Sequence, residues 1–290
     1  MSEQTEQRLE LARHYLTVGN PQRALDALAQ ATAVDDEEYW ELRAAALLDL
    51  DRWQDAAEAA RGGLALEPDN VFLLDMLGIA ELELEHGGAA LEAIDAALEI
   101  VPDYPTLLAH RALILARLKR FDEAENAIEE AIAIEPEAVD VLRVRSQVSF
   151  LKGDLAAATE HADELLEADP DNELSHLLRG NVAVEKGRYR HAVRHFEEAA
   201  RLNPEIGEIR DVLRENRVAA HPILAPVRPI WRVGRLRSWL IYVTIAGLLA
   251  AAHLQTARIA IAAVWVTIVA ISWLAPPLLR RWYGRGNSGF

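Results

Sequence analysis

Apolar residues recur every three or four positions along most of the first 200 residues, and charged residues fill the positions between them. This is the period of an amphipathic helix, so we expect helices rather than strands. Prolines interrupt the pattern at a spacing of 34 residues, at Pro68, Pro102, Pro136, Pro170 and Pro204. Each should end a helix, because proline cannot continue one and also restricts the residue before it. A fixed period of this length predicts an array of one repeated helical unit.

Small residues follow the same period. They fall at matching places in successive units, at Gly78, Ala112, Ser146 and Gly180, and again at Ala56, Ala90, Ala124, Ala158 and Ala192. Small side chains let two helix backbones approach closely, as a helix-turn-helix unit requires. Gly153 and Gly187 fall between the two helices of their units, where the backbone often needs a positive φ.

The pattern resembles the tetratricopeptide repeat family. The family motif is matched at Trp40, Leu77, Gly78, Ala90, Ala97 and Pro102, and again at Gly180, Ala192, Phe196, Ala199 and Pro204. The resemblance covers about residues 5–206 as six repeats, of which the first is degenerate and two residues short. It implies an all-α fold: a right-handed superhelical solenoid of about six helix-turn-helix repeats over residues 1–206. A capping helix at 207–219 would cover the last apolar face.

The chain changes character after residue 221, beyond which there is no Asp or Glu. Two apolar runs, 238–257 and 259–279, are each about as long as a membrane-spanning helix. We interpret residues 237–280 as a transmembrane helical hairpin that turns at Arg258. A buried hairpin of a soluble domain is the less favoured interpretation, because neither run has a polar face.

The segments on either side of the hairpin are polar or irregular. The Pro- and Arg-rich residues 220–236 are expected to form an extended linker, and 281–290 a basic, glycine-rich tail. Residues expected to flank the membrane are Arg232, Arg235, Arg237, Arg280 and Arg281, with Trp239 and Trp282 as interface anchors. Because arginines favour the cytoplasmic side, we expect the repeats and both termini in the cytoplasm. The composition is common in GC-rich bacteria, which suggests an inner-membrane protein; the absence of cysteine fits a reducing compartment.

The charge balance and motifs exclude several function classes. Up to residue 221 there are 46 acidic and 22 basic residues, so the repeats should not bind nucleic acid. We find no phosphate loop and no hydrolase motif, and Gly284, Gly286 and Gly289 match a dinucleotide motif only within the tail. His191 and His195 could share a metal, but no third ligand is evident. We therefore expect no enzyme activity, catalytic residue, metal or cofactor.

The resemblance implies that the first helix of each repeat lines a concave groove that binds a protein partner. By position, the groove residues would be Glu38, Glu41, Asp49, Phe72, Asp75, Ile79, Leu82, Glu83, Leu113, Arg117, Arg143, Gln147, Phe150 and Asn181. The acidic N-terminal half predicts a basic, partly apolar peptide or helix as partner. The favoured function is a membrane-anchored scaffold or adaptor, with an assembly factor among the roles that fit. The alternative is a stoichiometric subunit of a multi-protein membrane complex, held through the hairpin.

Overall fold

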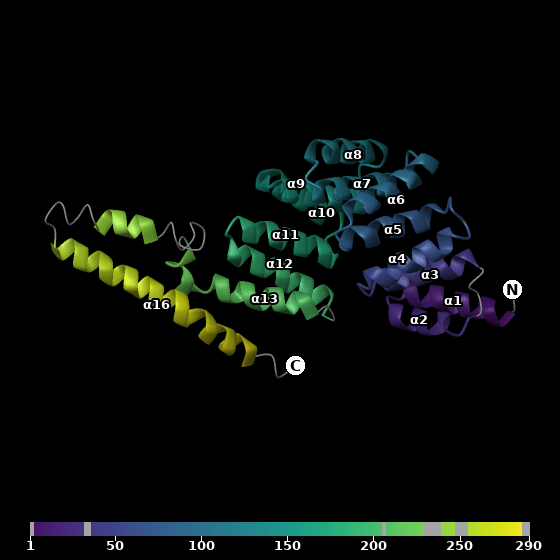
Figure 1. Cartoon of the computed structure of the whole chain (residues 1–290). Coiled ribbons are helices and arrows are strands. Elements are labelled where there is room, and N and C mark those ends of the chain that lie inside the picture. The colour runs from purple at the N-terminus through teal and green to yellow at the C-terminus, as the bar shows by residue number, and fades with distance from the viewer. Residues whose placement is uncertain (1–2, 32–35, 205–206, 229–238, 247–254, 286–290) are drawn as a thin grey trace. The chain divides into compact units, whose positions relative to one another are not determined.

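The computed structural model describes residues 3–31, 36–204, 207–228, 239–246 and 255–285, and every regular element in these ranges is a helix (Figure 1). The chain divides into two compact units, Met1–Asp169 and Pro170–Phe290. We describe each unit by itself.

The first unit consists of five pairs of helices. These are α1 (Glu3–Thr17) with α2 (Pro21–Leu28), α3 (Glu37–Leu48) with α4 (Trp53–Leu64), α5 (Val71–Glu83) with α6 (Gly87–Ile100), α7 (Pro105–Arg117) with α8 (Phe121–Ile134), and α9 (Val139–Lys152) with α10 (Leu155–Ala168). Each odd-numbered helix packs against the even-numbered helix that follows it. The expectation of an all-α array of paired helices is confirmed.

The helix ends follow from particular residues. Helix α6 ends at Ile100 and α8 at Ile134, in each case two residues before a proline of the 34-residue series. At the other end, the side chain of Asn70 accepts a hydrogen bond from the backbone N–H of Leu73 at 3.0 Å and so caps α5. Such caps satisfy N–H groups that have no partner inside the helix.

The turn between the helices of a pair contains one residue in the left-handed region. These residues are Gly19, Asp51, Glu85, Lys119, Gly153 and Gly187, with φ between 54° and 84°. The expectation of a positive φ at both predicted glycines is confirmed. Asp51, Glu85 and Lys119, which occupy the same position in other repeats, are not glycine, so the sequence alone did not indicate their conformation.

The small residues of the repeat lie where the helices of a pair meet. Ala56, Ala90, Ala124 and Ala158 are fully buried. At Gly180, in the second unit, an added Cβ would overlap the fully buried ring of Phe196. The small-residue register therefore marks the contact surface between paired helices, as predicted.

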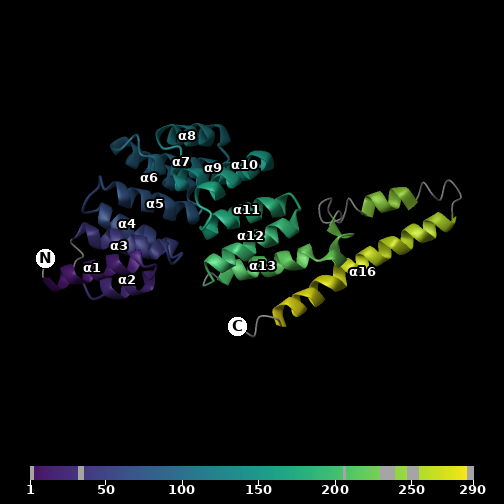
Figure 2. The ribbon, with the colours of Figure 1, turned by 180° about the vertical axis from the view of Figure 1, so that it is seen from behind.

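The second unit contains the last repeat pair, α11 (Glu173–Glu185) with α12 (Tyr189–Leu202), followed by α13 (Gly207–Ala220), a short 3₁₀ helix η1 (Pro222–Leu224) and the long α16 (Gln255–Arg285). Helix α12 packs on α13, and α13 on α16. Residues 239–246 are also helical and lie alongside the N-terminal part of α16 (Figures 1 and 2).

Two expectations for this region need correction. The described part of the linker is not extended: after η1 the chain turns back, and Leu224 and Val227 become fully buried. Packing against α16 removes more of their apolar surface from water than an extended segment would, and this burial is favourable. The hairpin turn is also not at Arg258, because the helical backbone of α16 begins at Gln255 and continues through this residue.

Among the described residues, one helix is long and apolar enough to cross a membrane, the segment Gln255–Tyr283 of α16. Two had been predicted. The first predicted run is described only at residues 239–246 and 255–257, and Arg232, Arg235 and Arg237 lie outside the described residues. The two-helix hairpin is therefore a proposal, taken up below.

Candidate functional site

The first helices of the pairs form a continuous layer in the unit Met1–Asp169. Helix α1 contacts α3, α3 contacts α5, α5 contacts α7, and α7 contacts α9. We call the face of this layer that carries the predicted groove residues the odd-helix wall. Because neighbouring helices are in direct contact, side chains on it can meet across one repeat boundary.

The predicted groove residues differ in how far they are open to a partner. Asp49, Phe72, Glu83 and Arg117 are exposed, whereas Glu38, Glu41, Asp75, Ile79, Leu113, Arg143, Gln147 and Phe150 are half-buried. Asn181 is exposed on α11 of the second unit. Leu82 is only 5% exposed and belongs to the core cluster that contains Leu74 and Ile114, so it cannot contact a partner on the surface. Phe72, at 60%, is the large apolar side chain most open on this wall.

Several acids of the wall already contact a basic side chain of the adjacent odd-numbered helix. Arg13 on α1 pairs with Glu38 on α3. His110 Nδ1 lies 2.6 Å from the carboxylate of Asp75, and the Arg117 guanidinium lies 2.6 Å from that of Glu83. The sequence analysis missed this pairing, although the partners in the last two pairs are separated by about one repeat length. The wall is therefore less negative than its count of acids suggests.

A negative patch remains where α3 meets the start of α5. The Asn70 amide donates to Glu41 at 2.7 Å and to Glu67 at 3.1 Å. The pKa of Glu37 is raised by a side-chain hydrogen bond with Glu67 and by the charge of that residue. We call Glu37, Glu41 and Glu67 the acidic patch. Within the described ranges, no Lys or Arg forms an ion pair with any of the three.

Phe72 is the second residue of α5, whose N-cap Asn70 contacts the acidic patch, and its side chain is exposed. Asp49 lies at the other end of α3, as its C-cap. Its side chain is exposed as a whole, yet the neighbouring helices remove enough water from the carboxylate to raise its pKa. The repeats up to α5 thus carry both negative charge that is unpaired among the described residues and the large exposed apolar side chain of Phe72.

The later part of the wall is mixed in character. Arg143 on α9 pairs with Asp140 one turn earlier, at 3.2 Å. The side-chain oxygen of Gln147 is buried and has no hydrogen-bond partner among the described residues. A buried acceptor without a donor costs about 1–3 kcal/mol, so this position lowers the stability of the array.

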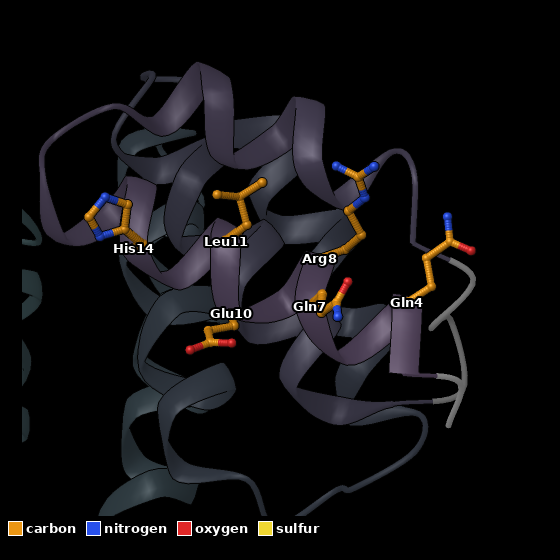
Figure 3. A pocket seen from close by; sticks show the side chains of 6 residues that line it. All are labelled: Gln4, Gln7, Arg8, Glu10, Leu11 and His14. Carbon is orange, nitrogen blue, oxygen red and sulfur yellow. The ribbon is translucent and has the colours of Figure 1, made fainter.

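Neither hollow described on the first unit resembles an active site. One follows α1 alone, and Figure 3 shows its six side chains: Gln4, Gln7, Arg8, Glu10, Leu11 and His14. All six belong to a single helix, and no second element brings a catalytic group towards them. This hollow therefore offers surface but no arrangement of acid, base and nucleophile.

The second hollow lies between α8, α9 and α10 and contains a serine–histidine contact. Ser149 Oγ is 2.9 Å from His161 Nδ1. Burial lowers the pKa of His161, and the charge of Arg145 adds to the effect. The nearby guanidinium of Arg145 is held by Glu164 at 2.8 Å. Ser149 lies within a helix, where backbone N–H groups are used by the helix itself, so an oxyanion would find no backbone donors from this helix.

The remaining predicted residues were candidate metal ligands and membrane-flanking groups. No cluster of three or more His, Asp or Glu side chains able to hold a metal is found among the described residues. Trp239 and Trp282 are 49% and 63% exposed. Arg281 is exposed, and the Arg280 guanidinium lies 4.0 Å from Glu215 on α13.

Comparison with family models identifies the repeats. Models described as tetratricopeptide repeat match residues 9–71, 76–134, 111–173 and 174–206. The chain belongs to the tetratricopeptide repeat family. This is a family of protein-interaction scaffolds that bind protein partners and are typically not enzymes. No curated protein matched the sequence significantly.

Several solved structures share the fold of the repeats. The crystal structure of PilW, described as a widely conserved type IV pilus biogenesis factor, matches at 20% identity and a TM-score of 0.56, covering 73% of this chain and 100% of PilW. TTC0263, a protein of Thermus thermophilus, matches at 19% identity and a TM-score of 0.58, covering 63% and 99% of the two chains. PilF of Pseudomonas aeruginosa matches at 19% identity and a TM-score of 0.50, covering 72% and 96%.

Proposed function

We propose that this tetratricopeptide repeat protein is a membrane-anchored scaffold that binds a basic, partly apolar segment of a protein partner on the odd-helix wall. The observations that carry the proposal are the acidic patch of Glu37, Glu41 and Glu67 and the exposed ring of Phe72, which follows by two positions the residue that contacts the patch, Asn70. A Lys or Arg of the partner would sit against the carboxylates while a neighbouring apolar side chain covers the ring.

The crowding of like charges supplies a physical reason for this preference. A side-chain hydrogen bond with Glu67 and the charge of that residue raise the pKa of Glu37, so the ionised form of Glu37 is disfavoured here. A bound cation would favour it. Charge complementarity then sets selectivity and the rate of encounter, while desolvated apolar contacts at Phe72 carry more of the affinity.

The membrane anchor is part of the same proposal. Helix α16 has the length and composition to cross a bilayer, and arginines lie on both sides of the apolar region. We propose that residues 237–280 form a helical hairpin whose turn precedes Gln255, with the repeats and both termini in the cytoplasm. The acidic repeats are not expected to bind nucleic acid.

A photo-crosslinking amino acid at position 72 of the full-length protein tests the proposed site in cells. The matched control is position 134, because Ile134 is an exposed apolar residue at the end of α8, on an even-numbered helix. We expect a discrete adduct from position 72 and none from position 134. The crosslinked segment of the partner should contain Lys or Arg beside apolar residues.

Calorimetry with a synthetic peptide of the crosslinked partner segment then separates the contributions of Phe72 and of the acidic patch to the binding free energy. Phe72→Ala should weaken binding by about 1 kcal/mol or more, as expected for a hot spot. Ile134→Ala should leave affinity unchanged, and reversing the charge of Glu41 and Glu67 should weaken binding most at low salt. An acidic segment, or equal crosslinking from both positions, would move the binding site away from the odd-helix wall.

An assembly factor is one role that such a scaffold could fulfil. PilW is a biogenesis factor, but at 20% identity its likeness to this chain concerns the fold alone. The alternative, a stoichiometric subunit of a membrane complex, is favoured by the most apolar 18-residue stretch of α16, of which only 6% is buried among the described residues. Extraction in mild detergent discriminates between them: a stable multi-subunit particle indicates a subunit, and a monomer indicates an adaptor.

A further inference from the structure

The two halves of α16 have different surroundings within the second unit. From Ile268 onwards, α16 packs in a cluster with Val218 of α13, Leu224 of η1 and Val227 after it; its own members are Ile268, Ile271, Ala275, Leu279 and Tyr283. The N-terminal half instead faces the short helix 239–246, where Tyr242 stacks on Trp265 with ring centroids 4.8 Å apart. Figures 1 and 2 both show this short helix beside the N-terminal part of α16.

The element packed on the C-terminal half is strongly charged. On α13, Glu215 is 71% exposed and lies 4.0 Å from Arg280, while Arg217 pairs with Glu197 at 2.9 Å. Ionised side chains in the centre of a bilayer cost several kcal/mol each and occur there rarely. The part of α16 that contacts α13 therefore lies in water or among lipid headgroups, although the residues of α16 there are mostly apolar.

The length of α16 points to the same boundary. Its 31 residues extend about 46 Å at 1.5 Å per residue, whereas a hydrocarbon core is about 30 Å thick. About 20 residues counted from Gln255 reach Leu274, immediately before the buried Ala275. Trp273, 71% exposed, would then lie at the interface, where tryptophan is enriched. Charge and length thus place the boundary near Leu274, within the stretch from Ile268 to Tyr283 that packs in the cluster.

We propose that α16 is a bipartite helix, an inference that rests on the proposed membrane anchoring. Residues 255–274 cross the bilayer, and residues 275–285 emerge on the side of the repeats and dock on α13 and η1. The last repeat is therefore coupled to the membrane through one continuous helix rather than through a flexible linker. The exposed side of the docking segment, with Leu278 and Trp282, contacts lipid headgroups.

Depth measurements on the full-length protein in lipid bilayers test the register. The chain has no cysteine, so single cysteines for nitroxide labels can be placed without background at Ile259, Val264, Leu274 and Leu278, all exposed on α16. We expect the ratio of oxygen to nickel-complex accessibility to be highest at Val264, high at Ile259 and lowest at Leu278. If residues 259–279 span the bilayer instead of residues 255–274, Ile259 and Leu278 will lie at about equal depth. That result would overturn the proposal.

The docking is tested separately by label mobility. Leu278 and Leu279 are neighbours, but Leu279 packs in the cluster and Leu278 is 62% exposed. The label should be immobilised at position 279 and mobile at position 278. The substitution Val218→Asp in α13 should make the label at position 279 mobile. Equal mobility at both positions would reject the docked segment even if the depth profile is as expected. High nickel accessibility at all four depth positions would reject the membrane anchor itself.

Discussion

In each of the six helix pairs, the turn between the two helices contains one residue in the left-handed region, and only three of these six residues are glycine. Asp51, Glu85 and Lys119 adopt φ of 54° to 64° in the same place as Gly153 and Gly187. A residue with a Cβ pays about 1–2 kcal/mol for this conformation. The fold therefore imposes a backbone geometry that part of the sequence does not favour.

Gly153→Ala should destabilise the first unit by about 1 kcal/mol or more. At this position nothing lies within 4 Å of an added Cβ, so the loss reports backbone conformation alone. The control is Gly88→Ala, which also has open space around it but lies within α6 and should raise stability by about 0.5–1 kcal/mol. Urea unfolding followed by circular dichroism measures both. Similar effects of the two substitutions would contradict this explanation.

Asp49 and Asp154 should give stability opposite dependences on pH. Desolvation raises the pKa of Asp49, so its folded state takes up a proton before the unfolded chain does, and the cost of Asp49 falls as pH decreases. Backbone hydrogen bonds from Ala157 and Ala156 lower the pKa of Asp154, so its contribution is present at neutral pH and is lost as pH falls through its folded pKa.

The expected results are therefore opposite in sign. At pH 7, Asp49→Asn should be more stable than the parent and Asp154→Asn less stable. Both differences should shrink as the pH approaches and passes the usual aspartate range, near 4. Thermal unfolding from pH 7 to pH 3 measures them. If the two variants change in the same direction, desolvation and helix capping are not the causes.

At the scale of elements, a buried carboxylate joins consecutive repeats. Glu81 on α5 is 2% exposed; it pairs with Arg61 of α4, and its second oxygen lies 2.7 Å from His86 Nδ1 in the turn before α6. The guanidinium of Arg61 is half exposed, so the ion pair bridges from the core to the surface. One carboxylate thus connects three segments of the array.

Arg61→Ala should be much more costly than Arg52→Ala. Removing Arg61 leaves a buried carboxylate without its guanidinium, which should reduce the free energy of unfolding by about 1–3 kcal/mol. Arg52 pairs with Asp55 on the surface at 2.5 Å, and its loss should cost at most about 0.5 kcal/mol. Denaturant titration of both variants compares them directly. Equal losses would show that burial of Glu81 contributes nothing to the pair.

At the scale of the whole molecule, charge separates the chain into two regions. All 46 acidic residues precede residue 221, and eight arginines follow it. An acidic repeat region is repelled by anionic lipid, whereas the arginines beside the apolar segment are attracted to it. The chain therefore has one region suited to a protein partner and another suited to a membrane.

Labelling in intact cells tests the proposed topology. Cysteines introduced at Ser2 and Ser288 should resist an impermeant thiol reagent, and one at Gln255 should react, because a hairpin returns both termini to the cytoplasm. If α16 were the single span, Ser2 and Ser288 would lie on opposite sides and only one of them would be protected. Labelling after membrane permeabilisation controls for the reactivity of each position.

The 34-residue period determined a large part of this structure by itself. Prolines and small residues affect the backbone locally, so the positions of Pro102, Pro136 and Ala90 predicted where helices end and where they meet. The predicted groove positions also lie on the first helices of the pairs. Apart from buried Leu82, they are exposed or half-buried. These features depend on residues close in sequence, which a repeated pattern makes visible.

Only the tertiary structure decided which charges and apolar side chains remain available. The pairing of Glu83 with Arg117, the burial of Leu82 and the packing of Leu224 against α16 depend on contacts between separate helices. The apolar run 259–279 gave no sign that its end is covered by a charged helix. Hydrophobicity records that a side chain avoids water, but whether protein or lipid covers it depends on what the fold brings next to it.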